Sequence, residues 1–231
     1  MAAQEDTKAK NAEASLNERV SGFLQKNRLF VLIGLGILVL ILAGFVITST
    51  VRGKILSNAL STVNGFSSRY EVIKPNIDSG DPEALGKQVV LMGEIDAFLA
   101  KNSGLAAARA YSIRANINAD QNQWAEAEEA WTKAASAAGK NYLAPVSLFN
   151  AAVAAEEQGK TDTAISLYLK ALDYGDVFPS AVKAQFSVGR LEESRGNKDA
   201  AIEAYRNLLS KWPNDLVWPN LAQNRLLVLS D

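Results

Sequence analysis

A repeat with a period of 37 residues in the second half of this 231-residue chain restricts the folds that the chain can adopt. The segments that align at this spacing are residues 122–134, 159–171 and 196–208. In each segment a small residue is followed four positions later, about one helical turn on, by an aromatic residue. A repeat of about 20–50 residues is typical of solenoids, in which each unit packs against its neighbours. The period therefore predicts a stack of helical hairpins.

The residue types within the repeat fit such a hairpin. The small residues, which let two helices approach closely, are Ala127, Ala164 and Ala201. The aromatic residues, which would fill the gap between neighbouring hairpins, are Trp131, Tyr168 and Tyr205. The positions where the chain must reverse, and where a left-handed conformation is expected, are Asn122, Gly159 and Gly196. Pro213 then ends the third unit.

This pattern resembles the tetratricopeptide repeat, whose units usually have about 34 residues with small residues, an aromatic residue and a closing Pro in this order. The resemblance covers about residues 108–213, and the expected repeats are 108–141, 145–178 and 182–215. Three extra residues per period fall near residues 139–141 and 174–176. The early Trp of the pattern is absent, and its places are taken by Tyr111, Leu148 and Gln185.

A solenoid needs terminal helices that cover its open ends. We expect these capping helices at Glu83–Lys101 and at residues 216–229. The predicted fold class is therefore all-α, with about three repeats between capping helices in a domain that spans residues 83–231.

The apolar segment Leu29–Val51 contains no charged residue. Arg28 precedes it, and Arg52 and Lys54 follow it. A bilayer core of about 30 Å is crossed by roughly 20 helical residues, so the length fits. The segment has no polar face, which argues against a buried core helix, and it exceeds the roughly 7–15 apolar residues of a cleaved signal peptide. It predicts one uncleaved transmembrane helix.

The basic residues near this segment slightly favour a cytoplasmic tail, residues 1–28, and an exported carboxy-terminal domain. The first fifteen or so positions are expected to be disordered. From Leu16 onward the helical spacing is equally compatible with a helix at the membrane surface and with an extension of the transmembrane helix. After the membrane, residues 52–82 are expected to form a stalk helix that Pro75 ends, followed by a turn-rich linker.

The composition argues against an enzyme. The chain has 0 Cys and 0 His, so it lacks a thiolate nucleophile and the commonest metal ligand and general base. With 24 basic and 25 acidic residues, it has no net field that would attract nucleic acid. The segment Gly159–Thr161 looks like the end of a phosphate-binding loop, but Ala154 stands where that motif needs its first Gly. We expect no cofactor, no metal and no catalytic residue.

The concave face of a helical solenoid, lined by the first helix of each unit, is its usual binding surface. The groove positions of the tetratricopeptide repeat correspond here to Arg109, Ser112, Asn116, Phe149, Asn150, Val153, Glu156, Phe186, Arg190 and Glu193. Aromatic residues beside Arg are typical anchors of protein interfaces. For Phe149 and Phe186, packing between helices remains an equally open interpretation.

The order of tail, single anchor, stalk and repeats resembles the YfgM-like family, bacterial ancillary subunits of the Sec translocon. The segments that carry this resemblance are Lys26–Arg28, Ile95–Asn102 and Gln223–Ser230. The resemblance implies a single-pass protein of the bacterial inner membrane whose periplasmic repeats bind translocon subunits and a membrane-anchored periplasmic chaperone, and which aids exported polypeptides. The alternative is a scaffold in envelope assembly or cell division, unrelated to the translocon.

Overall fold

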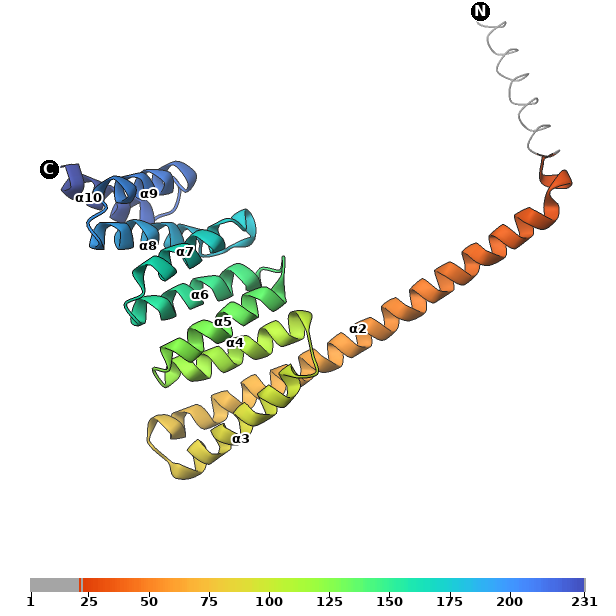
Figure 1. Cartoon of the computed structure of the whole chain (residues 1–231), viewed down its shortest axis with the longest axis horizontal. Helices are drawn as coiled ribbons and strands as arrows, with labels where there is room; N and C mark the ends of the chain where they lie inside the picture. Colours follow the sequence, from red (N-terminus) through yellow and green to blue (C-terminus); the bar gives the residue numbers. More distant parts are fainter. Residues whose placement is uncertain (1–20, 22, 231) are drawn as a thin grey trace, which may run out of the picture. The chain divides into compact units, whose positions relative to one another are not determined.

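The computed structural model describes residue 21 and residues 23–230. All regular secondary structure within these residues is helical, which confirms the predicted all-α class (Figure 1). The predictions for the tail, disorder in the first positions and a helix from Leu16, fall largely outside the described residues. The chain divides into two compact units, Met1–Ser57 and Asn58–Asp231, which are described separately below.

The first unit contains the apolar part of helix α2, whose full extent is Arg28–Asp78. Its large side chains are exposed, as in Phe30 at 75% and Leu40 at 73%. Water would penalise such exposure over so many apolar residues, whereas lipid tails would not. The helix is long and apolar enough to cross a membrane.

In the second unit, the remainder of α2 pairs with α3 (Pro82–Leu99). Val63, Phe66 and Tyr70 of α2 and Leu91 and Ile95 of α3 form one buried cluster. These residues recur at intervals of three and four along each helix, so they line the two faces that meet.

The prediction that Pro75 ends this helix is wrong, because α2 continues to Asp78. Pro75 lies in the last turn, where its missing N–H removes only one intrahelical hydrogen bond. Ile73 and Ile77 on either side of it pack against the α2–α3 cluster, and this burial favours another turn of helix. Helix α3 then begins at Pro82, directly after its N-cap Asp81, whose side chain accepts a hydrogen bond from the N–H of Glu83.

The following helices form a stack of hairpins in chain order (Figure 1). They are α4 (Gly104–Asp120), α5 (Trp124–Ala138), α6 (Leu143–Glu157), α7 (Thr161–Leu172), α8 (Ala181–Ser194), α9 (Lys198–Lys211) and α10 (Trp218–Ser230). A short 3₁₀ helix, Gly175–Val177, precedes α8. The pairs α4–α5, α6–α7 and α8–α9 are the three repeats, and α10 packs on α9 as the last helix.

Backbone geometry confirms the prediction for the turns inside the repeats. Asn122, Gly159 and Gly196 have positive φ angles of 59°, 71° and 80°. Each lies between the two helices of one repeat and takes the left-handed conformation that Gly and Asn tolerate best.

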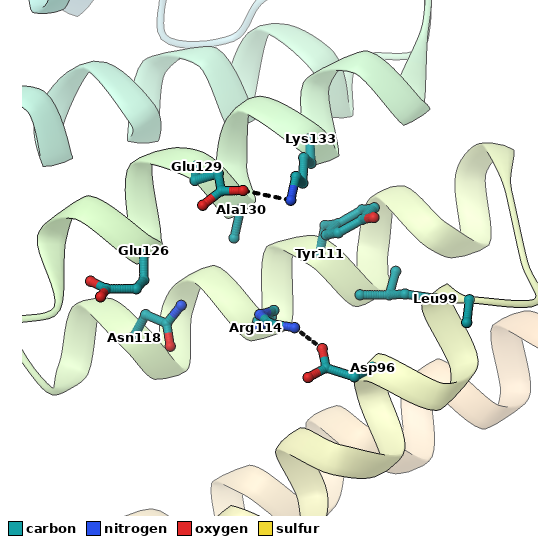
Figure 2. A pocket seen from close by; sticks show the side chains of 10 residues that line it. Asp96, Leu99, Tyr111, Arg114, Asn118, Glu126, Glu129, Ala130 and Lys133 are labelled. Carbon is teal, nitrogen blue, oxygen red and sulfur yellow. Dashed lines mark ion pairs between the residues drawn. The ribbon is translucent and has the colours of Figure 1, made fainter.

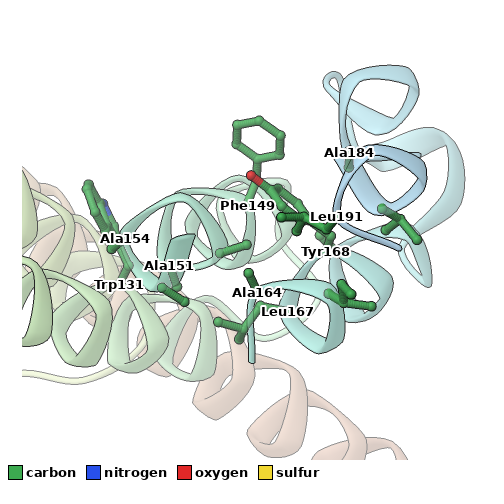
Figure 3. Close-up of a cluster of buried hydrophobic side chains, with 14 of the residues drawn as sticks. Trp131, Phe149, Ala151, Ala154, Ala164, Leu167, Tyr168, Ala184 and Leu191 are labelled. Carbon is green, nitrogen blue, oxygen red and sulfur yellow. The ribbon is translucent and has the colours of Figure 1, made fainter. Parts of the chain in front are cut away.

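The core of the stack is built from alanines and a few aromatic rings (Figure 3). Ala127, Ala164 and Ala201 are fully buried, so the helices of each hairpin pack closely. Tyr168 meets Phe149 edge to face with ring centroids 5.2 Å apart. Packing of this kind repeats along the chain, so stability is distributed over the interfaces between neighbours.

Candidate functional site

The carboxylate of Glu156 joins two adjacent repeats. It lies on α6, the first helix of the second repeat, and accepts a hydrogen bond from the Tyr168 hydroxyl of α7 at 2.6 Å. Its other oxygen pairs with Arg190 of α8, in the next repeat. Burial and the bond to Glu156 raise the pKa of Tyr168. Glu156 therefore links three helices.

One repeat later, Glu193 makes the same kind of contacts. Its carboxylate accepts a hydrogen bond from the Tyr205 hydroxyl at 3.1 Å and pairs with Arg225 of α10. The hydrogen bond from Arg225 holds the pKa of Glu193 below its usual range. Burial, with the bond to Glu193, raises the pKa of Tyr205 to about 12. The last helix thus supplies the cation that α8 supplies to Glu156.

A related arrangement joins the first hairpin to the repeats. Asp120, at the end of α4, accepts a hydrogen bond from the Tyr70 hydroxyl at 2.8 Å and from the Lys74 ammonium at 2.6 Å. Burial and the bond to Asp120 raise the pKa of Tyr70. The α2–α3 hairpin is therefore bonded to the first repeat by the same chemistry.

Two hollows lie beside these contacts. The first, the C-terminal hollow, has a volume of about 420 Å³. It is lined by Phe186, Arg190, Glu193, Ser194, Tyr205 and Arg225. Phe186 is partly buried and its ring packs against Tyr205 and Trp218, so one edge of the hollow is apolar.

The second, the N-terminal hollow, has a volume of about 330 Å³. It is lined by Ser67, Tyr70, Glu71, Lys74, Ile113, Asn116, Ala119, Asp120, Trp131 and Asn150. Asn116 and Arg190 are two repeat periods apart and hold equivalent positions, so the two hollows lie on the same face of the stack. This face is formed mainly by the first helices of the repeats.

The side chains of Asn116 and Asn150 make no hydrogen bond to another residue in the described part of the chain. Each amide offers both donors and an acceptor. Two such amides in one hollow can bond the N–H and C=O groups of an extended peptide, which always occur together. The N-terminal hollow thus has free hydrogen-bonding capacity of the kind a peptide needs.

The structure distributes the predicted groove residues unevenly. It brings Phe186, Arg190 and Glu193 together in the C-terminal hollow, and Asn116 and Asn150 in the N-terminal hollow. Glu156 lines neither hollow, because it is bonded to Tyr168 and Arg190. Arg109 is exposed on α4 and lines neither hollow.

For Phe149, whose side chain was expected either to line the groove or to pack between helices, the structure shows packing between helices. Its ring is 8% exposed and contacts Tyr168 and Phe178. The Lys183 ammonium lies over the ring, 5.3 Å from its centroid. Phe149 therefore belongs to the core of the stack and offers no free surface to a partner.

Sequence analysis did not assign four residues to this face, namely Lys74, Asp120, Arg225 and Trp131, the last of which it placed between hairpins. Arg225 follows Glu193 by 32 residues, close to the 34 residues between Glu156 and Arg190. That spacing could have predicted Arg225 as the partner of Glu193. The repeat period gives no such indication for Lys74 and Asp120, because their helices differ in sequence from those of the later repeats.

The described residues contain no group of three or more His, Cys, Asp or Glu side chains that could hold a metal ion. Most of the carboxylates on this face are already paired with a cation or a hydroxyl. These hydrogen bonds and ion pairs join neighbouring helices along the face.

Comparison with known proteins finds tetratricopeptide repeat proteins. The family model for the tetratricopeptide repeat matches residues 149–215. A TPR repeat-containing protein of Treponema pallidum (strain Nichols) is 30% identical over 228 residues, which cover 92% of this chain and 93% of that protein.

Among solved structures, the Arabidopsis OM64 TPR domain is 24% identical, covers 53% of this chain and 95% of its own, and has a TM-score of 0.44. The first TPR of Spaghetti (RPAP3), bound to the HSP90 peptide SRMEEVD, is 24% identical over 56% of this chain and 95% of its own, with a TM-score of 0.45. MamA is 20% identical over 64% of this chain and 78% of its own, with a TM-score of 0.47.

Proposed function

Because this chain belongs to the tetratricopeptide repeat proteins, we propose that it is a membrane-anchored scaffold that binds partner proteins through the face carrying the two hollows. The observation that carries this proposal is the pair of unbonded amides, Asn116 and Asn150, in the N-terminal hollow. A partner segment in extended conformation would bond its backbone there. The apolar edge at Phe186 would take one of its side chains in the C-terminal hollow.

The proposal includes the membrane and the side on which the repeats lie. The apolar part of α2 crosses the bacterial inner membrane once, the tail stays in the cytoplasm and the repeats face the periplasm. The length and apolarity of the segment support the span, and the distribution of basic residues supports the orientation.

The partners we propose are subunits of the Sec translocon, a membrane-anchored periplasmic chaperone and exported polypeptides. The support for this finer assignment is the resemblance of Ile95–Asn102 and Gln223–Ser230 to the YfgM-like family. An anchor raises the effective concentration of a weak binding face at the site of export, so a modest affinity suffices. The protein would act by holding partners near the translocon, without catalysis.

The test is site-specific photo-crosslinking in intact cells, with the probe at Asn116, Asn150 or Ser194. These positions line the hollows, and Ser194 lies outside the ion pairs, so the probe leaves the contacts of Glu156 and Glu193 intact. Glu203, exposed on α9, is the matched control. We expect crosslinks to translocon or chaperone subunits from the three hollow positions and none from the control.

The other outcomes are equally informative. Crosslinks from the hollows to envelope-assembly or division proteins would replace the translocon by the alternative scaffold role. If none of the three hollow positions gives a crosslink while the protein is intact in the membrane, this face does not bind the partners.

A further inference from the structure

A third pocket lies between α3, α4 and α5 and shares no residue with the two hollows (Figure 2). It is lined by Asp96, Leu99, Ala100, Tyr111, Arg114, Asn118, Glu126, Glu129, Ala130 and Lys133. Residues 116 and 118 of α4 point about 200° apart around the helix axis. Since Asn116 lines the N-terminal hollow, the pocket of Asn118 opens on the opposite side of α4.

The charges in this pocket do not balance. Arg114 pairs with Asp96, and Lys133 pairs with Glu129 at 2.6 Å (Figure 2). The bond to Lys133, with the charge of Arg114, lowers the pKa of Glu129, so both cations are engaged. Glu126 has no ion-pair partner among residues 23–230. The pocket therefore carries one carboxylate in excess.

Asn118 gives the second observation. The residue is 2% exposed and lines the pocket, and its side-chain amide makes no hydrogen bond to another described residue. Its hydrogen-bonding groups are therefore available to a molecule in the pocket. Figure 2 shows Asn118 and Glu126 at the same end of the pocket. An unpaired carboxylate and an unbonded amide thus face the same space.

The chemistry of the lining selects the ligand. An anion would be repelled by the excess carboxylate. A bare metal ion lacks a site, because the described residues contain no group of three or more acidic ligands close enough to hold one. A guanidinium group fits, since it offers five N–H donors to Glu126 and to the amide oxygen of Asn118. The volume, about 300 Å³, suits one side chain.

We propose that this pocket is a separate binding site for an arginine side chain of a protein partner, held by Glu126 and Asn118. It rests on the proposed protein-binding function and adds to it a second surface with its own specificity. A partner would place an extended segment along the hollows and an arginine on the opposite side of α4, or two partners would bind at once.

The test is an NMR titration of the ¹⁵N-labelled full chain in detergent micelles with the peptide acetyl-Gly-Arg-Gly-amide. The control peptide has citrulline in place of Arg, which keeps the shape and removes the charge. We expect the side-chain amide signal of Asn118 to shift saturably with a dissociation constant of about 1 mM, and the citrulline peptide to cause no such shift. Exposed Glu126→Gln should weaken binding about threefold to tenfold, and Glu203→Gln, the matched control on α9, should not.

Three results would overturn the proposal: no shift of the Asn118 signal at about 10 mM peptide, equal shifts with citrulline, or unchanged affinity in Glu126→Gln. These results are separable from the crosslinking test. Crosslinks from Asn116 and Asn150 without a shift at Asn118 would leave the scaffold and remove this site. A shift at Asn118 without crosslinks would do the reverse.

Discussion

Arg190 of α8 pairs with the carboxylate of Glu156 on α6, one repeat earlier in the chain. The Tyr168 hydroxyl bonds the same carboxylate, so the contact can form only when both helices of one repeat and the first helix of the next are in place. The strength of this pair therefore reports on the coupling between neighbouring repeats. Both of its residues were assigned to partner binding from the sequence, and both are engaged in this contact within the chain.

A double-mutant cycle with Glu156→Gln and Arg190→Gln should detect this coupling. We expect an interaction free energy of about 0.5–1 kcal/mol, because the Arg190 side chain is half exposed, at 49%, while that of Glu156 is only 18% exposed. Urea unfolding followed by near-UV circular dichroism provides the measurement. The Glu83–Lys87 pair within α3, whose side chains are 76% and 60% exposed, is the control and should show a smaller coupling. Equal interaction free energies in both cycles would show that the Glu156–Arg190 pair does not stabilise the contact between repeats.

Gly189→Ala should destabilise the third repeat. A methyl group at Gly189 would lie 2.6 Å from a ring carbon of Tyr205, which is itself fully buried. Overpacking of this kind costs about 1–3 kcal/mol. Gly86→Ala on α3 is the matched control: open space surrounds that position, and Ala should stabilise the helix by roughly 0.5–1 kcal/mol. Thermal unfolding of both variants should move in opposite directions, and parallel shifts would contradict the close contact.

Stability should depend on pH through Glu193. Its folded-state pKa is lowered, first by the hydrogen bond from Arg225, so the folded protein binds a proton less readily than the unfolded chain does. The resulting stabilisation is complete above the unfolded pKa of about 4.3 and is lost as the pH falls through the lower folded pKa. The wild type should exceed Glu193→Gln in urea midpoint at pH 7, and the difference should shrink below about pH 4.3. A difference that stays constant down to pH 3 would show that Arg225 does not act on this carboxylate.

Two arginines in the apolar segment should release the protein from membranes. Leu38→Arg with Leu42→Arg places two charges near the middle of Leu29–Val51 and costs roughly 5–7 kcal/mol of insertion free energy. Alkaline extraction of membranes should recover the double variant in the supernatant. The chain with Ser57→Arg, outside the segment, should remain in the pellet. Retention of the double variant would place the anchor elsewhere in the chain.

The features that the sequence predicts well are those that repeat. The turns at Asn122, Gly159 and Gly196 recur at a fixed spacing, and each depends on local backbone conformation, which one residue type largely determines. The aromatic residues Tyr168 and Tyr205 follow the same period and are buried as expected. Local propensity and periodicity agree at these positions, so the fold class could be predicted from them.

The features that the sequence did not predict depend on contacts between distant segments. The helix continues through Pro75, where Ile77 is partly buried against the α2–α3 cluster, and a local rule for Pro does not include that contact. Phe149 and Phe186 are one period apart, yet Phe149 is buried under Lys183, whereas Phe186 borders a hollow beside Trp218 of the last helix. Period alone cannot separate them, because the neighbour on one side differs.

Arg225 belongs to α10, a helix outside the three repeats, yet it gives Glu193 the cation that Arg190 gives Glu156. The end of the stack is therefore chemically equivalent to one of its internal junctions. Duplication or loss of the third repeat during evolution would leave each remaining carboxylate of this kind with a hydroxyl and a cation. A stack of this kind can gain or lose a repeat, and so lengthen or shorten its binding face, while the contacts between its helices stay of the same type.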